Sequence, residues 1–339
     1  MNKAHLSRAA APGAAVLCAV PLLCLPAAAA PVEPFRAGFR PADSGAKIIK
    51  ETRVGRLGRD LTVRTPNLDV PVKVRVLLPK GWRKNAARTW PVLYAYSGGS
   101  DDYRSWTKNS RIEQWAAKYD AIVVMPEAAS SSYTNWWNGG KRGNPRWETF
   151  HTKDVIQLIE RNYRANKRRS AVGVSAGGMG AMKYAARNPR MYKFVAALSS
   201  PLWMTGPGIP ASTALTAITQ SQSVWDIFGD PVIDRANWER NDPYVLAKGL
   251  RGTKIYFSAG TTGKAGPGDP EVSPLDVGLS GEQIVGELNR AFDERLDKLG
   301  IKHTANLYGD GRHNWPAWRR IMKDLWPKLM KSLNAEKIG

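Results

Sequence analysis

The sequence SAVGVSAGGMGA at residues 170–181 places Ser175 between an apolar run and a run rich in glycine and alanine. The apolar run predicts a buried strand, and the residues that follow, as far as 188, predict a helix. A serine on a sharp strand-to-helix turn needs small neighbours, because the strained backbone and the close helix leave no room for side chains. Gly173 and Gly177 meet this need, so the segment predicts a nucleophilic serine.

The rest of the chain predicts one α/β domain. Short apolar or alternating runs provide eight strand candidates, at 61–64, 72–78, 91–96, 121–125, 170–174, 194–199, 254–258 and 304–308. From the third run onward, helix-like patterns fill the intervals, including 112–118, 152–163, 177–188, 281–299 and 315–333. This alternation predicts a mostly parallel sheet with helices on both faces. The first two strands, joined by a turn at 66–69, indicate an antiparallel start.

Two segments interrupt the alternation. Residues 130–147 are rich in Gly, Asn and Trp, and residues 201–242 mix Gly, Pro and Ser with short helical pieces. Ligands of open α/β sheets bind outside the carboxyl ends of the strands, where such insertions lie. We therefore expect both segments to form walls of a substrate cleft. Trp136 and Trp315 are the aromatic residues that we expect to contact substrate, although large aromatics more often serve packing.

The first thirty residues predict an export signal. Lys3 and Arg8 precede an apolar stretch at 14–25, and small residues at 27–30 follow it, so we expect cleavage near Ala29 or Ala30. The apolar stretch is too short to span a membrane, which takes roughly 20 residues. We therefore expect a secreted protein without an integral membrane segment, with a signal peptide at 1–30, an irregular segment at 31–46 and a single domain at 47–339.

Composition narrows the functional classes. Both cysteines, Cys18 and Cys24, lie inside the expected signal, which excludes thiol catalysis and disulfides in the mature chain. The 50 Lys and Arg against 29 Asp and Glu give a net charge of +21, so attraction to an anionic cell-envelope surface is one reading and a genome-wide arginine bias the other. Basic residues do not alternate with aromatics as on a nucleic-acid surface, so we expect no nucleic-acid partner.

A nucleophilic serine needs a histidine base, and three histidines remain after the signal. His303 begins a predicted strand and His151 lies upstream of the serine. His313 lies in the loop between the last strand and the last helix, where the chain order serine, acid, histidine requires the base. We therefore predict His313 as the base. The three histidines show no ligand spacing, so we expect no metal, and we expect no cofactor.

The acid that orients the histidine should follow the penultimate strand. The segment at 260–281 offers Asp269, Glu271 and Asp276, with Glu282 at its far edge, and any of these carboxylates could serve chemically.

Two backbone amides should stabilise the oxyanion that forms during acyl transfer. One is expected from Ala176, the residue after the nucleophile, and the other from the flexible loop at 97–100, where we choose Gly99.

Several blocks, in the same order along the chain, make the sequence similar to the antigen 85 mycolyltransferase and esterase D branch of the α/β-hydrolases. The blocks are Asp101-Asp102-Tyr103 with Trp106, Ser131-Ser132-Tyr133-Thr134-Asn135-Trp136, Trp147-Glu148-Thr149-Phe150, the serine turn, Asn241-Asp242-Pro243 and His313-Asn314-Trp315. They extend over 71–333. The Trp-Glu-Thr-Phe and Asn-Asp-Pro blocks are specific to this branch, whereas the serine turn is shared more widely.

The resemblance implies an α/β-hydrolase fold and an acyl-serine mechanism. Ser175 and His313 fall on the family's nucleophile and base, and the oxyanion donors fall on Ala176 and Gly99. The family's acid is a glutamate in the loop before a helix. Laying 278–292 against that helix brings Asp276 to the acid's position, and Asp276 is our choice over Asp269 and Glu271.

These features predict a secreted, monomeric serine acyltransferase or esterase that acts on acyl esters or lipids, with a sugar or lipid hydroxyl as acceptor. Mycolyltransferases carry an Asp-Gly-Leu-Arg type of loop that helps to hold trehalose, whereas this chain has Ser-Gly-Gly-Ser at 97–100, so trehalose is not implied. A plain carboxylesterase, with water as acceptor, is the first alternative. A non-catalytic cell-envelope binding protein is the alternative of another class, because the family includes members without the triad.

Overall fold

The structure, a computed structural model, describes residues 38–138, 145–273 and 276–338, and the unit Arg36–Gly339 is compact. The expected signal peptide at 1–30 and the first part of the irregular segment at 31–46 lie outside the described residues. Within the described ranges, no helix is both long enough and apolar enough to cross a membrane.

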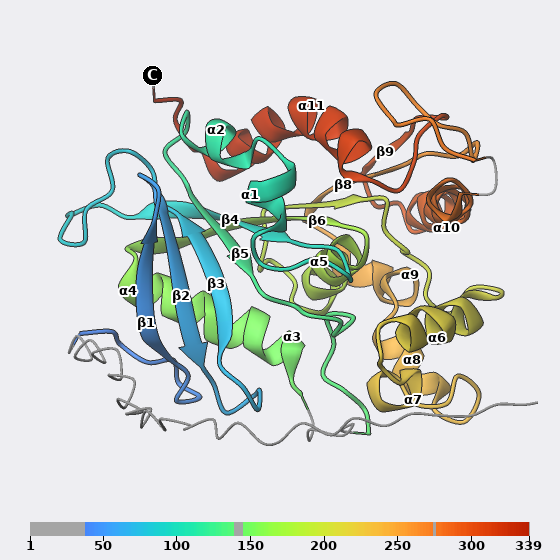
Figure 1. Ribbon diagram of the computed structural model, residues 1–339, viewed down its shortest axis with the longest axis horizontal. Helices are drawn as coiled ribbons and strands as arrows, with labels where there is room; N and C mark the ends of the chain where they lie inside the picture. Colours follow the sequence, from blue (N-terminus) through green and yellow to red (C-terminus); the bar gives the residue numbers. More distant parts are fainter. Residues whose placement is uncertain (1–37, 139–144, 274–275, 339) are drawn as a thin grey trace, which may run out of the picture. The chain divides into compact units, whose positions relative to one another are not determined.

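The central sheet of the described chain has nine strands in the order β1-β2-β3-β5-β4-β6-β7-β8-β9 (Figure 1). The strands are β1 (Lys47–Val54), β2 (Gly58–Arg64), β3 (Val72–Leu77), β4 (Trp90–Tyr96), β5 (Ile122–Pro126), β6 (Ala165–Val174), β7 (Phe194–Leu198), β8 (Lys254–Ala259) and β9 (Thr304–Leu307). The first three pair antiparallel, as does β3 with β5, and every other pair is parallel. The α/β fold and the antiparallel start are therefore confirmed.

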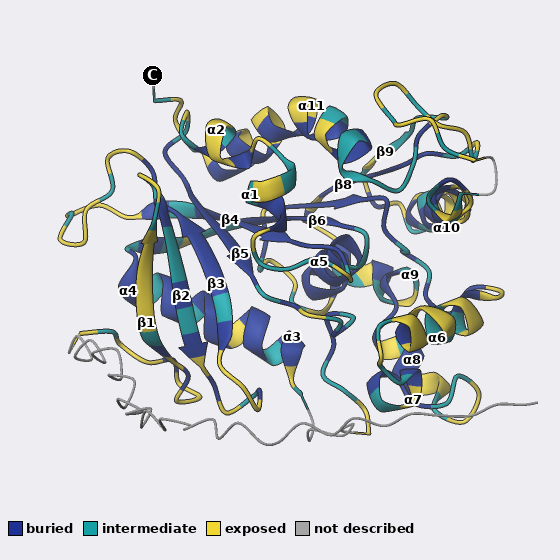
Figure 2. Ribbon diagram, in the orientation of Figure 1, coloured by how far each residue is buried: buried dark blue, intermediate teal, exposed yellow. Residues whose placement is uncertain are grey.

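The predicted number of eight strands was wrong, because β1 is an additional edge strand. Most of its residues are exposed, and Ile48 is its only fully buried side chain (Figure 2). An edge strand with two solvated faces has no alternating apolar pattern, so the sequence gives no period-two signal there.

Helices cover both faces of the sheet, as predicted. The α-helices are α1 (Ser105–Asn109), α2 (Ile112–Ala116), α3 (Trp147–Thr149), α4 (Ile156–Asn162), α5 (Ala176–Arg187), α6 (Ile209–Thr219), α7 (Val224–Ile227), α8 (Arg235–Arg240), α9 (Pro243–Leu246), α10 (Val277–Lys298) and α11 (Trp315–Leu333). A π-helical segment, η1 (Phe150–Val155), joins α3 to α4, and a 3-10 turn, η2 (Ala247–Leu250), follows α9. One apolar cluster packs α1, α2 and α11 on one face, and another packs α4, α5 and α10 on the other (Figure 1).

The alternation of side chains along β4 divides the core between these two faces. Leu93 and Ala95 belong to the cluster under α11, whereas Val92, Tyr94 and Tyr96 belong to the cluster under α5. Successive residues of a strand point to opposite faces, so a fully apolar strand can supply both cores at once.

The two insertions meet each other beside α5. The amides of Trp137 and Asn138 in the first donate to the carbonyls of Ile227 and Asp226 in the second, at 3.1 and 3.0 Å. A third apolar cluster, built around α6, α7 and α8, packs against Met179 of α5. The insertions therefore pack on α5, the helix that directly follows Ser175.

His151 lies in an aromatic cluster beneath α5. Its ring is fully buried, with Tyr96, Tyr133 and Tyr184 within ring-contact distance, and its Nδ1 and Nε2 bond to the Tyr184 hydroxyl at 3.0 Å and the Glu127 carbonyl at 2.9 Å. Burial lowers the pKa of His151 to about 4, with an additional unfavourable contribution from the charge of Lys183. His151 is therefore a neutral core residue in the folded protein.

We predict that His151 makes the fold acid-sensitive between pH 6.5 and 4. In this window the unfolded chain binds a proton at His151 that the folded chain does not, so the free energy of unfolding falls as the pH falls, by about 3 kcal/mol in total. Urea unfolding of the wild type and His151→Gln across this range measures the effect. The wild type should lose more stability than the variant; parallel curves for the two proteins would contradict the prediction.

Candidate active site

Ser175 occupies a sharp turn between β6 and α5. Its backbone has a φ of 53° and a ψ of −126°, a conformation that non-glycine residues rarely adopt. Its amide still donates to the carbonyl of Leu198 in β7, at 2.8 Å. The turn thus keeps its attachment to the sheet while it lifts the Ser175 side chain out of the strand.

Glycines permit this turn because α5 passes very close to the strands. A Cβ at Gly173 would overlap the backbone of Gly177, and a Cβ at Gly177 would overlap the carbonyls of Tyr96 and Ser97. The small residues predicted from the sequence therefore serve the close approach of α5 to β6 and to the end of β4.

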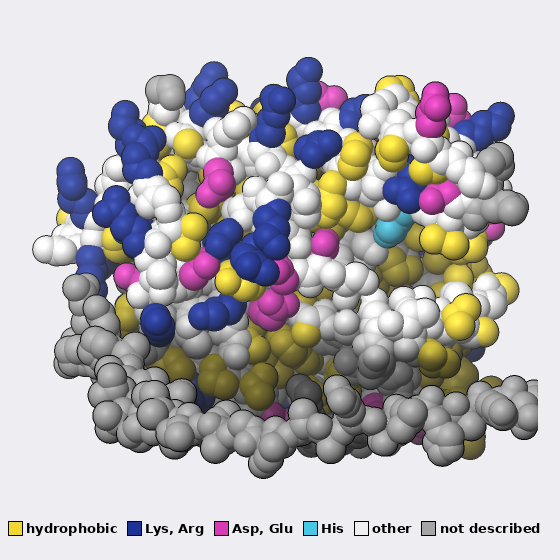
Figure 3. All heavy atoms as spheres, in the orientation of Figure 1, with side chains coloured by type: hydrophobic (Ala, Val, Ile, Leu, Met, Phe, Trp, Pro, Cys, Tyr) yellow, Lys and Arg dark blue, Asp and Glu magenta, His cyan; other side chains and the backbone are white. Residues whose placement is uncertain are grey.

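His313 lies between Ser175 and a carboxylate. Its Nε2 is 2.9 Å from the Ser175 Oγ, and its Nδ1 is 2.9 Å from the Oε2 of Glu282. The ring packs edge-to-face on Trp318, with centroids 5.2 Å apart, and 26% of the side chain is exposed. The space-filling view shows a histidine side chain in a hollow bordered by hydrophobic side chains (Figure 3). The arrangement has the connectivity of a serine, histidine and acid triad.

Glu282 is fully buried but richly hydrogen-bonded. Its Oε1 accepts from the Ser199 hydroxyl at 2.7 Å, the Gly260 amide at 2.7 Å and the Tyr308 hydroxyl at 3.0 Å. Burial opposes its ionisation, yet hydrogen bonds from His313, Gly260 and Ser199 outweigh burial and hold the pKa of Glu282 below its usual value. Glu282 is therefore an anion that can orient His313 and stabilise a positive charge on its ring.

Asp276, the acid chosen from the sequence, does not contact His313. Its carboxylate accepts from the amides of Gly278 and Leu279 at the start of α10, at 2.9 and 3.2 Å. It also forms a two-bonded ion pair with Arg312, at 2.7 and 2.8 Å. The pair with Arg312 lowers the pKa of Asp276. The choice is corrected to Glu282, because Asp276 caps the helix whereas Glu282 faces inward from it.

The other sequence candidates have structural surroundings. Asp269 accepts from the Gly266 amide and the Asn314 side chain, at 2.8 and 2.9 Å, while Glu271 is exposed. His303 bonds to Asp293 at 2.6 Å and lies away from the triad in the described contacts. Glu282, in contrast, had a usable signal in the sequence: it is a charged residue on the apolar stripe of an amphipathic helix.

The loop at 97–100 lies directly against the serine turn. A Cβ on Gly98 would be 3.7 Å from the Ser175 Cβ, and one on Gly99 would be 3.6 Å from the Ala176 Cβ. The Gly98 amide donates to Asp101, at 3.3 Å, whereas no acceptor among the described residues bonds the Gly99 amide. As the first residue of α5, Ala176 has an amide without an acceptor in its own helix.

The two tryptophans expected to contact substrate are partly buried. Trp315 packs edge-to-face against Trp106 and Trp318, with centroids 5.2 Å apart in both pairs. Trp136 packs against the cluster on α5, donates to the Ser131 carbonyl at 3.3 Å, and lines a separate pocket. Both side chains therefore have packing roles.

Comparison with known proteins places this chain in a family. Residues 65–329 match the profile of the family described as Esterase. The chain belongs to the esterase family. A diacylglycerol acyltransferase/mycolyltransferase Ag85B of Mycobacterium intracellulare is 28% identical over 266 residues, covering 74% of this chain and 77% of that protein. An esterase of Mycobacterium tuberculosis is 29% identical over 258 residues, covering 74% of this chain but only 54% of that protein.

Two solved structures share the fold of this chain. MPT51 of Mycobacterium tuberculosis superposes with a TM-score of 0.69 at 20% identity, covering 82% of this chain and all of that one. An S-formylglutathione hydrolase of Agrobacterium tumefaciens gives 0.64 at 20% identity, covering 84% and 99%. These likenesses confirm the α/β-hydrolase fold, and the Ag85B match confirms the resemblance to the antigen 85 branch.

We predict that Ser199→Ala destabilises this fold by about 1–3 kcal/mol. The buried carboxylate of Glu282 would lose a donor. The Trp318 indole, which donates to the Ser199 hydroxyl at 2.9 Å, would lose its acceptor. Urea unfolding at neutral pH measures the loss. Ser212→Ala is the matched control, since that hydroxyl bonds only to its own helix at the surface, and should change stability by less than about 0.5 kcal/mol. Equal effects of the two substitutions would refute the prediction.

Proposed function

We propose that this protein is a secreted serine acyltransferase or esterase that acts on acyl esters through an acyl-serine intermediate. The observation that carries the proposal is the continuous hydrogen-bonded chain from the Ser175 Oγ through His313 to the buried Glu282, with both bonds at 2.9 Å. Membership of the esterase family supports it, as do relatives named as acyltransferases and esterases.

In the proposed reaction, the Ser175 Oγ attacks the ester carbonyl while its proton passes to the Nε2 of His313. The resulting oxyanion accepts bonds from the amides of Ala176 and Gly99. The bond to the leaving alcohol then breaks, and the alcohol takes the proton from His313. An acceptor hydroxyl repeats these steps in reverse: its proton passes to His313, its oxygen attacks the acyl carbon, and Ser175 is released with its proton restored.

Glu282 holds the imidazole throughout this cycle. Its bond to the Nδ1 fixes the tautomer that leaves the Nε2 free to accept a proton, and its negative charge stabilises the imidazolium that forms twice. Three further donors hold the carboxylate in place, so little reorganisation accompanies proton transfer.

An uncharged segment attached to the loop beside the serine favours an acyl substrate. Residues 201–225 contain no charged side chain, in a protein where 23% of residues are charged. Helix α6 lies in this segment, and its Leu215 and Ile218 are 65% and 68% exposed. The side chain of Gln220, just after α6, donates to the Ser100 hydroxyl at 3.1 Å. This bond attaches the uncharged segment to the loop beside Ser175.

The acceptor is the finer part of the proposal. Transfer to a sugar or lipid hydroxyl is the reading that the acyltransferase relatives favour, and hydrolysis is the reading that the esterase relatives favour. We favour transfer, because an uncharged segment with exposed apolar side chains, attached next to the acyl-serine, disfavours water. The expected export signal and the positive charge suit an enzyme of the cell envelope.

A triad with Glu282 as its acid predicts unequal effects of two neighbouring carboxylates. Ser175→Ala should lower kcat for a p-nitrophenyl ester by about 10⁴-fold or more, and Glu282→Gln by about 10²- to 10⁴-fold. Asp276→Asn, the matched control at the N-terminal cap of the same helix, should lower kcat by less than about tenfold. Steady-state kinetics of the four proteins, with thermal unfolding to verify folding, make the comparison. A larger loss in Asp276→Asn than in Glu282→Gln would remove Glu282 from the mechanism.

A fluorophosphonate probe separates this enzyme from a binding protein of the same fold. The folded wild type should be labelled at Ser175, and Ser175→Ala should not. Absence of labelling in the folded wild type would favour a non-catalytic binding protein.

The acceptor prediction is tested with p-nitrophenyl hexanoate in the presence of glycerol or glucose. Transfer should appear as the hexanoyl ester of the added alcohol, detected by mass spectrometry, and the ratio of ester to free hexanoate should rise with alcohol concentration. Reactions with Ser175→Ala correct for uncatalysed exchange. Free hexanoate as the sole product at every alcohol concentration would show that the protein is an esterase and refute the proposed transfer to an alcohol.

A further inference from the structure

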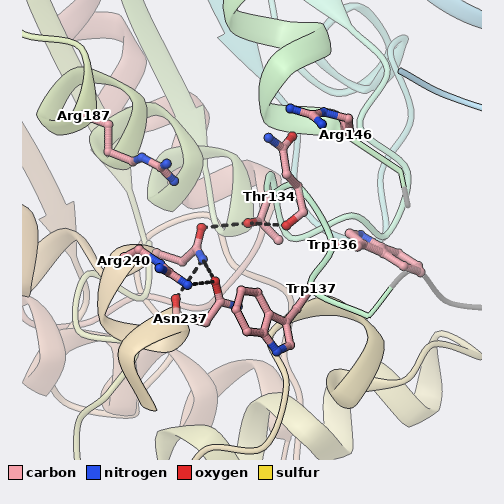
Figure 4. A pocket seen from close by; sticks show the side chains of 9 residues that line it. Thr134, Trp136, Trp137, Arg146, Arg187, Asn237 and Arg240 are labelled. Atoms are coloured by element: carbon pink, nitrogen blue, oxygen red, sulfur yellow. Dashed lines mark hydrogen bonds between the residues drawn. The ribbon is translucent and has the colours of Figure 1, made fainter. Parts of the chain in front are cut away.

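A pocket of about 420 Å³ lies at the opposite end of α5 from the serine (Figure 4). Residues 134–137, Arg146, Arg187 and part of α8 line it. Arg187 follows Ser175 by twelve helical residues, which separates the two positions by about 18 Å. None of the triad residues lines this pocket, so it is a separate site.

Three guanidinium groups from three different elements surround the opening. Arg146 precedes α3, Arg187 ends α5 and Arg240 ends α8, and Figure 4 shows them on different sides of one hollow. Arg187 pairs with Glu148 at 3.1 Å, whereas neither Arg146 nor Arg240 pairs with a carboxylate among the described residues. The pocket therefore carries an uncompensated positive charge.

Two of these groups are held in place by neighbouring side chains. The guanidinium of Arg240 lies 5.3 Å from the centre of the Trp137 ring and 3.4 Å from the Asn237 Oδ1. Arg187 is fixed by its pair with Glu148. Because these contacts already order both side chains, an anion that binds there loses less side-chain entropy in ordering the site.

The floor of the pocket is polar and neutral. The Thr134 hydroxyl donates to the Asn241 Oδ1 at 2.7 Å. The side-chain Nδ2 of Asn135 donates to the Thr149 hydroxyl at 3.0 Å. The buried Nζ of Lys183 also donates to the Asn241 Oδ1, at 3.1 Å, from below. Each carboxamide NH₂ has a second hydrogen, so Asn135 keeps a donor for a ligand hydroxyl.

We propose that this pocket binds a sugar phosphate between Arg146 and Arg240, with the sugar placed against Trp137 and the neutral floor. Two guanidinium groups without a carboxylate partner in the described part of the chain match the charge of a phosphate monoester better than that of a single carboxylate. The volume falls within the range of small-molecule pockets, roughly 300–1,000 Å³, and exceeds what a bare phosphate fills. The indole of Trp137, 42% exposed, offers an aromatic surface to the sugar ring.

The proposal is tested by calorimetric titration of the full chain with glucose 1-phosphate, inorganic phosphate, glucose and glycerol 3-phosphate. Salt at about 0.15 M screens the general attraction of anions to a chain of net charge +21. Glucose 1-phosphate should bind saturably at one site and at least tenfold more tightly than the other three. The result should be the same in Ser175→Ala, because the pocket is separate from the triad.

Three substitutions locate the binding. Arg240→Gln and Arg146→Gln should each weaken glucose 1-phosphate binding by about tenfold or more, since each removes a charge-assisted contact. Arg235→Gln is the matched control: it lies on the same helix, pairs with Glu239 at 3.0 Å and does not line the pocket, so affinity should not change. Thermal unfolding verifies that each variant is folded, and the two pocket variants come from different elements.

The opposite results overturn the proposal. These are the absence of saturable binding, an equal affinity for inorganic phosphate, or glycerol 3-phosphate binding as tightly as glucose 1-phosphate, which would assign the pocket to a lipid headgroup. Unchanged affinity in both Arg240→Gln and Arg146→Gln would place the anion elsewhere on the surface.

Discussion

The site depends on the backbone of Ser175, which must leave the sheet abruptly and still remain attached to it. Its positive φ costs of order 1–3 kcal/mol. The neighbouring strand has a similar feature, because Ser199 has a φ of 47° and donates its amide to the Ser258 carbonyl at 2.7 Å. Two strained serines therefore stand at adjacent strand ends. One contacts the Nε2 of His313 and the other contacts the carboxylate that holds its Nδ1.

Two networks of buried charge lie near the two ends of α5. Near its start, Glu282 has four hydrogen-bonding partners and no exposure. Near its end, the buried Lys183 lies 3.6 Å from Glu148, which also pairs with Arg187, and burial lowers the pKa of Lys183 to about 8. Each network meets the cost of burying ions by satisfying nearly all of its polar atoms. The tyrosines and the neutral His151 occupy the space beneath the helix.

The positions of Ser175 and His313 in the fold could be predicted from the sequence because each follows a strand whose apolar pattern is clear. The acid could not be chosen correctly, because a loop carboxylate was expected and Glu282 lies in the second turn of α10. Asp276 is a carboxylate in the segment where the acid was expected, yet it is the cap residue of α10. The position of Glu282 on the apolar stripe of α10 distinguishes the two, because that stripe is buried in the fold whereas Asp276 lies at the end of the helix. The edge strand β1 was missed for the related reason that its exposed residues carry no pattern.

The insertion at 201–242 has two chemically different sides. Its first part, through α6, is uncharged and is attached to the loop beside Ser175 by Gln220. Its last part, α8, turns Arg240 and Asn237 toward the pocket at the far end of α5. An uncharged surface near the nucleophile suits the proposed acyl substrate, because charged residues there would be desolvated at a cost whenever an acyl chain bound. Separation of the arginines to the other side of the insertion allows one segment to contact an acyl group and an anion without either interfering with the other.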